Sequence, residues 1–267
     1  MKRIALVTTG GTIAGLAASE ADPTRYTAAA LGPDQLLAAV PTLTTLADIV
    51  PEALYSIDSK DALPEHWLQL ARRVGALLDD PVIDGVVITH GTDTLEESAF
   101  FLQLVLPVGK PVVFTGAMRP ANALSADGPL NLHQAVAVAA SGVTRDSGVV
   151  VVMNGEIHGA REVHKTHTLA PSAFSSPNAG PLGRADPPVL LRRPNGADGG
   201  RLPLADLVHT APLPEVALVT VASGVGPIFL QAVAQHCAGV VLALPGHGSL
   251  PAAWRGVVDQ LAQRGLP

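Results

Sequence analysis

Short apolar, strand-like runs alternate with longer helix-like segments through most of this chain. The strand-like runs include residues 4–7, 84–89, 111–115 and 148–153. The helix-like segments include residues 33–40, 64–78, 95–106 and 130–140. Strands that alternate with helices in this way form parallel sheets covered by helices. The pattern therefore predicts an α/β fold with a doubly wound, mainly parallel sheet.

The same pattern divides the chain into three parts. Residues 1–181 carry most of the alternation and are expected to form the N-terminal catalytic domain. Residues 182–214 are rich in proline, glycine and arginine, which predicts a linker. Residues 215–267 show a strand, helix, strand, helix order, which predicts a second, smaller α/β domain.

Two segments of the N-terminal part lack a clear periodicity. Residues 16–27 are small and polar with one aromatic, Tyr26, and we expect a mobile loop or lid there. Residues 154–181 are predicted to be a series of turns, with Lys165 among them.

Composition excludes several classes of protein. The net charge is −6 and the basic residues are scattered, so no nucleic-acid partner is expected. No apolar run is long enough to span a membrane, and the N-terminus offers no signal sequence. We therefore expect a cytoplasmic protein. Cys237 is the only cysteine, and His158, His164 and His167 lack a zinc spacing, so neither an intrachain disulfide nor a metal is predicted.

A glycine-rich turn follows the first strand-like run, with the sequence TTGGTIAG at residues 8–15. Gly10 and Gly11 tolerate positive φ and let backbone N–H groups face a ligand at the carboxyl end of a strand. Thr12 adds a hydroxyl, which makes it a candidate nucleophile beside an oxyanion site. A phosphate-binding or merely tight turn is the alternative. Neither nucleotide-binding glycine pattern is present, so nucleotide binding loses weight.

A second turn of similar composition, HGTD at residues 90–93, follows another strand-like run. Parallel strands end at the same edge of a sheet, so we expect Thr12 and Thr92 to face one cleft. Asp93 and Lys165 are the ionisable candidates beside Thr92. A lysine acts as a base only when its pKa is lowered, and an aspartate opposes that while orienting the amine. A solvated or ion-paired lysine is the alternative, and His90 is expected to shape the turn.

These motifs resemble those of the bacterial-type L-asparaginases, the asparaginase/glutaminase family. Residues 9–14 (TGGTIA) resemble the family's first threonine motif, and residues 85–94 (GVVITHGTDT) resemble its second. The segments GAMRP at 116–120, SADG at 125–128 and VHKT at 163–166 also fit in order. The resemblance covers the whole chain and is densest before Pro181.

The resemblance implies hydrolysis of the side-chain amide of L-asparagine by double displacement. Thr12 would attack the amide carbon to give an acyl-enzyme and ammonia, and water would then release L-aspartate. Tyr26 matches the tyrosine that hydrogen-bonds this nucleophile. Thr92, Asp93 and Lys165 match the group that positions the reacting amide and the water.

The resemblance also implies a substrate-binding site without a metal or organic cofactor. Its residues would be Gly11, Asp58, Ser59, Gly91, Thr92, Asp93 and Ala117. Asp58 and Ser59 would hold the α-carboxylate, and Asp93 would take the α-ammonium. The backbone N–H of Thr92, with Ala117 nearby, would polarise the carbonyl. The family also implies a homo-oligomer, a dimer or tetramer, in which an acidic residue of a neighbouring C-terminal domain completes the pocket around Tyr26.

Two departures from the family pattern matter. Lys60 stands where many members carry glutamine or a small residue, and a cation there would repel the α-ammonium unless it points away. The sequence ends at Pro267, where family chains continue, so the C-terminal domain is expected to be incomplete. From this we expect a disturbed oligomer and a poor asparaginase. A glutaminase or related amidase, or a catalytically weak asparagine-binding homologue, are the alternatives, and a nucleotide-binding module ranks third.

Overall fold

The computed structural model describes residues 1–194, 202, 204–207 and 212–267. The chain divides into two compact units, Met1–Ala211 and Pro212–Pro267. Among the helices that the structure describes, none has both the length and the apolar character needed to cross a membrane.

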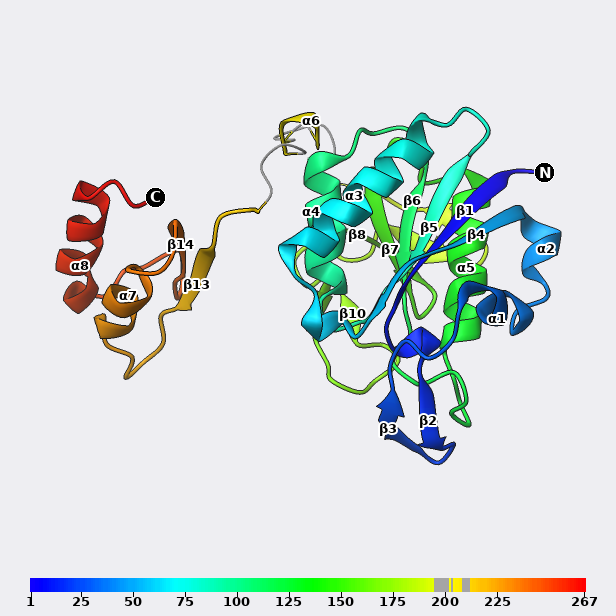
Figure 1. Cartoon of the computed structure of the whole chain (residues 1–267), viewed down its shortest axis with the longest axis horizontal. Coiled ribbons are helices and arrows are strands. Elements are labelled where there is room, and N and C mark those ends of the chain that lie inside the picture. Colours follow the sequence, from blue (N-terminus) through cyan, green and yellow to red (C-terminus); the bar gives the residue numbers. More distant parts are fainter. Residues whose placement is uncertain (195–201, 203, 208–211) are drawn as a thin grey trace. The chain divides into compact units, whose positions relative to one another are not determined.

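One large sheet organises the first unit. Its strands are β1 (Arg3–Gly10), β4 (Asp48–Ile57), β5 (Gly85–Thr89), β6 (Val112–Thr115), β7 (Val149–Met153), β8 (Glu156–Gly159), β11 (Gly183–Ala185) and β12 (Pro188–Leu190). They pair in the order β12-β11-β8-β7-β6-β5-β1-β4 (Figure 1). The strands from β7 to β4 are parallel, whereas β8, β11 and β12 extend one edge antiparallel. The predicted α/β fold with a mainly parallel sheet is confirmed.

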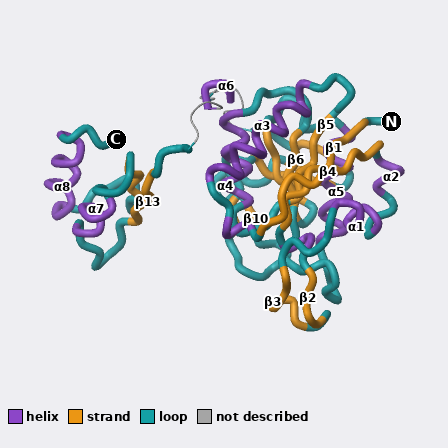
Figure 2. Tube along the Cα trace, viewed as in Figure 1, coloured by secondary structure: helices purple, strands orange, loops and turns teal. Residues whose placement is uncertain are grey.

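Helices cover both faces of this sheet, as Figure 2 shows around the central strands. They are α1 (Pro33–Ala38), α2 (Leu43–Leu46), α3 (Pro64–Asp79), α4 (Leu95–Val105) and α5 (Gly128–Ser141), with the short helix α6 (Leu204–Leu207) and the 3-10 turns η1 (Thr12–Ala14) and η2 (Ser59–Asp61). Helices α3 and α4 contribute apolar residues to the core on one face. Helices α1, α2 and α5 contribute to the core on the other face, so the sheet is doubly wound as predicted.

The central strands are apolar on both faces, which explains why the sequence predicts them well. In β1, Ala5 and Val7 pack toward α3 and α4, whereas Ile4 and Leu6 pack toward the opposite core. All four are at most 1% exposed. A strand buried on both sides reads as a continuous apolar run. Because β1 and β5 are parallel neighbours, the turns that follow them lie at the same edge of the sheet.

Residues 16–27 differ from the predicted mobile loop. They form a hairpin of β2 (Leu16–Ser19) and β3 (Asp22–Thr27), which pair antiparallel. Most described side chains of the hairpin are exposed, so its strands carry no alternation of apolar and polar residues. Without that alternation, sequence periodicity gives no strand signal.

Residues 154–181 also contain strands that the turn prediction missed. Asn154 and Gly155 both have positive φ, 49° and 82°, and link β7 to β8 as a tight hairpin. An Asn-Gly pair between two strands is a strong hairpin signal. Further along, β9 (His164–Lys165) and β10 (Phe174–Ser175) form a second small pair.

The predicted linker, residues 182–214, is structured at its beginning. Residues 183–190 form β11 and β12 of the main sheet rather than a connection. Helix α6 also lies in this range. Residues 195–201, 203 and 208–211 of the predicted linker lie outside the described residues.

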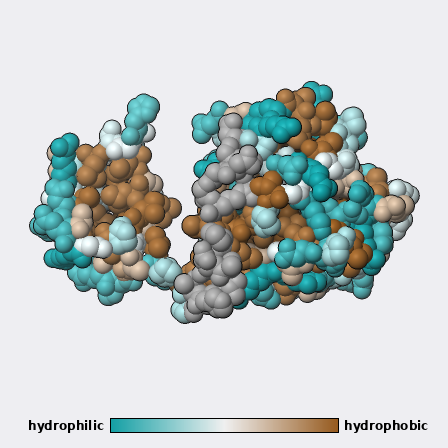
Figure 3. Space-filling model, turned by 90° about the horizontal axis from the view of Figure 1, so that it is seen from above, coloured by the Kyte–Doolittle hydropathy of each residue, from teal (hydrophilic) through white to brown (hydrophobic). Residues whose placement is uncertain are grey.

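The second unit has the predicted order of strand, helix, strand and helix. Its elements are β13 (Val216–Thr220), α7 (Ile228–Val233), β14 (Gly239–Ala243) and α8 (Ala252–Gln263). Strands β13 and β14 are parallel, and their core contains Val221, Leu230 and Trp254. Apolar surface gathers on this unit (Figure 3), whose large exposed hydrophobic residues are Val216, Leu218, Ile228, Phe229 and Val241.

Candidate active site

The candidate nucleophile Thr12 lies in η1, directly after the glycine turn that ends β1. Gly10 and Gly11 have φ values of 102° and 79°, which L side chains rarely adopt. A Cβ on Gly10 would lie 2.5 Å from the carbonyl oxygen of Ile57, so the turn needs glycine for space as well. The Thr12 hydroxyl lies 2.7 Å from the hydroxyl of Tyr26, although Thr12 is only 6% exposed. The turn therefore presents one buried hydroxyl that already has a hydrogen-bond partner.

Tyr26 reaches Thr12 because the β2–β3 hairpin is held against the loop that follows β6. Asn122 accepts a hydrogen bond from the Ala17 N–H (2.7 Å) and donates one to the Ala17 carbonyl (2.8 Å). Gly15 leaves room for the tyrosine ring, since a Cβ there would lie 2.8 Å from Tyr26 Cδ2. Tyr26 itself remains 37% exposed, so it forms the outer wall of the site.

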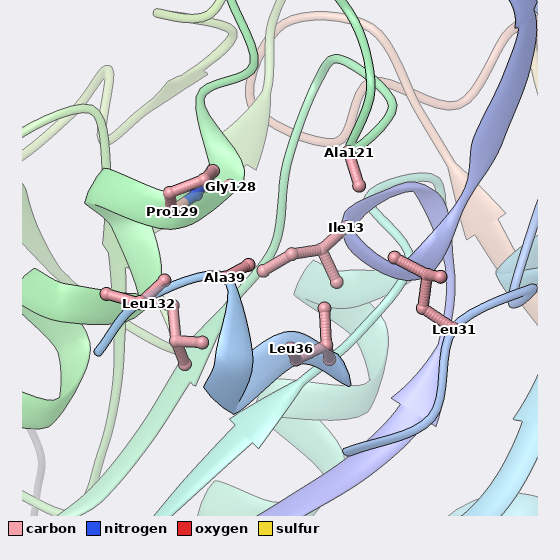
Figure 4. A pocket seen from close by; sticks show the side chains of 9 residues that line it. Ile13, Leu31, Leu36, Ala39, Ala121, Gly128, Pro129 and Leu132 are labelled. Carbon is pink, nitrogen blue, oxygen red and sulfur yellow. The ribbon is translucent and has the colours of Figure 1, made fainter. Parts of the chain in front are cut away.

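An apolar pocket between α1 and α5 holds the side chain of Ile13 and thereby anchors η1. Ile13, which follows the nucleophile, points between α1 and α5 (Figure 4). It is 2% exposed and belongs to the same core as Leu36 and Leu132. Ile13 thus anchors in the core the same short turn whose Thr12 contacts Tyr26.

The second threonine turn lies against the first. A Cβ on Gly11 would lie 2.3 Å from the Cα of Gly91, and a Cβ on Gly91 would lie 2.5 Å from the hydroxyl of Ser59. Ser59, in η2, accepts a hydrogen bond from the Asp93 N–H at 3.2 Å. The ends of β1, β4 and β5 therefore meet at one point, and Gly11, Ser59 and Gly91 are brought together there.

Lys165 joins the second turn from β9. Its Nζ donates to Thr92 Oγ1 at 2.9 Å and to Asp93 Oδ1 at 2.6 Å. The lysine side chain is 17% exposed, whereas that of Asp93 is 55% exposed. Thr92 and Asp93 lie just before the N-terminus of α4, where backbone N–H groups favour negative charge. The three residues form one hydrogen-bonded group.

Asp58 does not stand free at the predicted substrate-binding turn. Its carboxylate accepts a hydrogen bond from the ammonium of Lys60, which also lies 3.6 Å from Asp61. The hydrogen bond with Asp58 raises the pKa of Lys60. Lys60, whose positive charge would repel the α-ammonium of a substrate, is therefore paired with two carboxylates.

Ala117 is held in place by two residues to which the sequence assigned no role. Asp127 accepts hydrogen bonds from the N–H groups of Met118 (2.9 Å) and Arg119 (3.0 Å). Asn131 donates to the Gly116 carbonyl at 3.0 Å. Asp127 is the N-cap of α5 and Asn131 lies in its first turn, so the available signal was their place at the start of this helix. Ala117 itself is fully buried, so its contribution to a ligand has to come from the backbone.

His90 is buried in the turn between β5 and α4. Its Nδ1 lies 2.8 Å from the Gly91 carbonyl oxygen, and burial lowers the pKa of the imidazole to about 4. A histidine that stays neutral and bonds its own turn shapes the backbone. Within the described part of the chain, no group of three His, Cys, Asp or Glu side chains is arranged to hold a metal ion.

These features define a doubly wound α/β protein with a polar site at the carboxyl edge of its sheet, where ligands bind in such folds. Residues 3–194 match the family model described as asparaginase, N-terminal. The chain belongs to the asparaginase family.

Known relatives agree with this assignment. The chain is 49% identical over 183 residues to a glutaminase-asparaginase of Pseudomonas fluorescens biotype A, a match that covers 68% of this chain and 50% of the relative. It is 35% identical to L-asparaginase 2 of Bacillus subtilis (strain 168), over all of this chain and 71% of the relative. The chain spans about half the length of the first curated relatives it matches.

A solved structure supports the same fold. The crystal structure of a probable cytoplasmic L-asparaginase from Campylobacter jejuni matches with a TM-score of 0.93 at 41% identity. The match covers 100% of this chain and 82% of that one.

Proposed function

We propose that the chain hydrolyses the side-chain amide of L-asparagine to L-aspartate and ammonia through a threonine acyl-enzyme. The contact between the hydroxyls of Thr12 and Tyr26, 2.7 Å apart, carries the proposal. Thr12 lies on a turn packed against Gly91, next to the Thr92–Asp93–Lys165 group. A reacting carbonyl placed there has a nucleophile on one side and a donor-rich turn on the other.

In the first half of the reaction, Thr12 Oγ1 forms a bond to the amide carbon and the C–N bond breaks. The hydroxyl proton of Thr12 passes to the leaving nitrogen, which departs as ammonia. Tyr26 is the group within reach to take part in that transfer, because its hydroxyl can accept from Thr12 while releasing its own proton. Backbone N–H groups at Thr92 and Ala117 stabilise the negative charge that develops on the carbonyl oxygen.

In the second half, water attacks the acyl carbon, the bond to Thr12 Oγ1 breaks, and the proton returns to Thr12. The Thr92–Lys165 pair fixes the hydroxyl of Thr92, since Lys165 Nζ donates to its oxygen. The hydrogen of Thr92 is then available to orient the amide or the water. Holding a reactant in this way lowers the entropic part of the barrier.

Substrate recognition uses the turns that meet at Gly91. Lys165 bonds Oδ1 of Asp93, which leaves Oδ2 to take the α-ammonium of asparagine. Ser59 accepts a bond from the Asp93 N–H, so its own hydroxyl hydrogen can donate to the α-carboxylate. Both contacts select an α-amino acid over a simple amide.

Glutamine is the second candidate substrate. Several relatives at 47–49% identity, including the one from Pseudomonas fluorescens, are named glutaminase-asparaginase. The same double displacement acts on glutamine, whose side chain is longer by one methylene group. Relative kcat/KM values on the two amino acids decide between them.

Trapping with hydroxylamine tests the acyl-enzyme. With asparagine as substrate, hydroxylamine competes with water for the acyl-enzyme and gives the hydroxamate of aspartate, while the total release of ammonia does not fall. Direct attack by water on the amide gives no hydroxamate. Formation of hydroxamate by the wild type and its loss in Thr12→Ala support the proposal. Ammonia release without hydroxamate contradicts it.

Assembly and location are further parts of the proposal. We expect a homo-oligomer, which light scattering of the purified protein measures directly. The name of the Campylobacter jejuni protein places that protein in the cytoplasm and supports the same location here.

A further inference from the structure

Glu96, in the first turn of α4, reaches across to β9 with both oxygens of its carboxylate. Oε2 accepts a hydrogen bond from the backbone N–H of Lys165 at 2.5 Å. Oε1 lies 3.2 Å from Nδ1 of His164. The Glu96 side chain is 28% exposed, so the contact is partly shielded from water. One carboxylate therefore holds both residues of this short strand.

The Lys165 N–H is free to meet Glu96 because of how β9 is paired. Lys165 lies opposite Phe174 of β10, and the next residue, Thr166, donates its N–H to the Ala173 carbonyl at 2.7 Å. Successive N–H groups of a strand point to opposite sides, so the N–H of Lys165 points away from β10. A strand of two residues is weakly held by its ladder alone.

Glu96 also lies close in sequence to Thr92 and Asp93, the two residues that the Lys165 ammonium contacts. It follows Thr92 by four residues and Asp93 by three. The segment from Thr92 to Glu96 thus contacts Lys165 at its ammonium and at its backbone. Asp93, Glu96 and Lys165 line the same solvent-open pocket.

We propose that Glu96 is a positioning residue, which fixes the backbone of Lys165 so that its ammonium reaches Thr92. The proposal rests on the proposed function for its catalytic consequence. A carboxylate suits this position because it lies at a helix N-terminus and makes a charge-assisted hydrogen bond. Misplacing a catalytic group by about 1 Å costs on the order of 100-fold in rate.

The neighbouring Glu97 offers a matched control. It is the same residue type on the same turn, and burial raises its pKa. In the described residues, no hydrogen bond joins Glu97 to β9. Loss of a carboxylate at position 97 removes similar charge from the helix N-terminus without releasing Lys165.

The first experiment measures kcat and KM for asparagine in single and double variants. We expect Glu96→Ala to lower kcat roughly 10- to 100-fold with little change in KM. Glu96→Gln keeps an acceptor for the Lys165 N–H and should recover most of the activity, and Glu97→Gln should resemble the wild type. In a Lys165→Met background, Glu96→Ala should change kcat less than about twofold, because a residue that acts through Lys165 has nothing left to position.

The second experiment measures amide hydrogen exchange at Lys165 by NMR and does not depend on activity. The N–H should exchange at least roughly tenfold faster in Glu96→Ala than in the wild type or in Glu97→Gln, at unchanged Tm. Equal exchange in all three proteins overturns the contact. An equal loss of kcat with and without Lys165 overturns the positioning role. A wild type that releases no ammonia refutes the proposed function, while the exchange result still decides whether Glu96 holds Lys165.

Discussion

Gly11 and Gly91 touch so closely that a Cβ on Gly11 would lie 2.3 Å from the Cα of Gly91. The turn that carries Thr12 can contact the turn that carries Thr92 because Gly11 has no Cβ. We expect Gly11→Ala to push the two turns apart and to abolish turnover. The measurement is kcat for ammonia release, together with Tm.

Gly142 provides the control for this substitution. Its φ of 71° is close to the 79° of Gly11, but no atom lies within 4 Å of the place of its Cβ. Gly142 has a left-handed backbone (ψ 7°), where alanine costs roughly 1–2 kcal/mol, whereas Gly11 (ψ −171°) lies in a region essentially restricted to glycine, where alanine costs on the order of 1–3 kcal/mol. Gly142→Ala should therefore lose stability and keep its activity. Equal activity in the two variants would show that the contact between the turns is dispensable.

Thr92 and Lys165 are expected to act as a unit, because Lys165 Nζ donates to Thr92 Oγ1 at 2.9 Å. Thr92→Val and Lys165→Met should each lower kcat roughly 100-fold or more, and the double variant should lose little beyond that. Lys110→Met removes a lysine that bonds the Asp80 carbonyl instead and should leave kcat unchanged. Fully multiplicative losses in the double variant would argue against a shared function.

The pair of Asp58 and Lys60 is expected to set the charge beside the substrate's amino group. Asp58→Ala leaves the Lys60 ammonium without its nearest partner and should raise KM for asparagine severalfold, up to about fivefold for an exposed pair. Adding Lys60→Gln should bring KM back toward the wild-type value. If Lys60→Gln alone raises KM as much as Asp58→Ala, the lysine helps to hold the substrate rather than repelling it.

His158 is expected to contribute to the pH dependence of stability. Burial, and then the charge of Arg192, lower the pKa of this imidazole to about 4 in the folded protein. Glu156 Oε2 lies 3.4 Å from Nε2, but that carboxylate is half exposed and burial prevails. An unfolded chain takes up the proton near pH 6.5, so between these values the unfolded state binds more protons. Stability therefore falls as the pH is lowered from about 6.5 to about 4, by roughly 3 kcal/mol for this group.

Urea unfolding at a series of pH values measures this contribution. The free energy of unfolding of His158→Gln should fall less steeply over that range than that of the wild type. A slope for His158→Gln equal to that of the wild type would contradict a neutral, buried imidazole.

The sequence was sufficient to place Thr12 and Thr92 at one edge of one sheet. Strands such as β1 and β5 are buried on both faces, so their apolar runs are unambiguous and their glycine turns mark the ends. Parallel pairing then puts both turns together. That part of the site follows from local pattern and topology alone.

The sequence was not sufficient to show what holds these residues. Tyr26 lies on an exposed hairpin whose strands do not alternate apolar and polar residues. Asn122, which holds this hairpin in place, lies 105 positions from its partner Ala17. Glu96 contacts Lys165 from 69 positions away. Contacts between residues so far apart in sequence depend on how separate loops pack, and the hydrophobic periodicity of a single sequence does not reveal them. The resemblance to a family supplied the pairing of Thr12 with Tyr26, and the structure gives its geometry.

Ammonia release from asparagine by the purified wild type and by Thr12→Ala is the decisive measurement for Thr12 as the nucleophile. We expect the wild type to release ammonia from asparagine. Thr12→Ala should keep the fold and lose turnover, because a methyl group cannot form an acyl-enzyme. Near wild-type ammonia release by Thr12→Ala, or asparagine binding without ammonia release by the wild type, would contradict it.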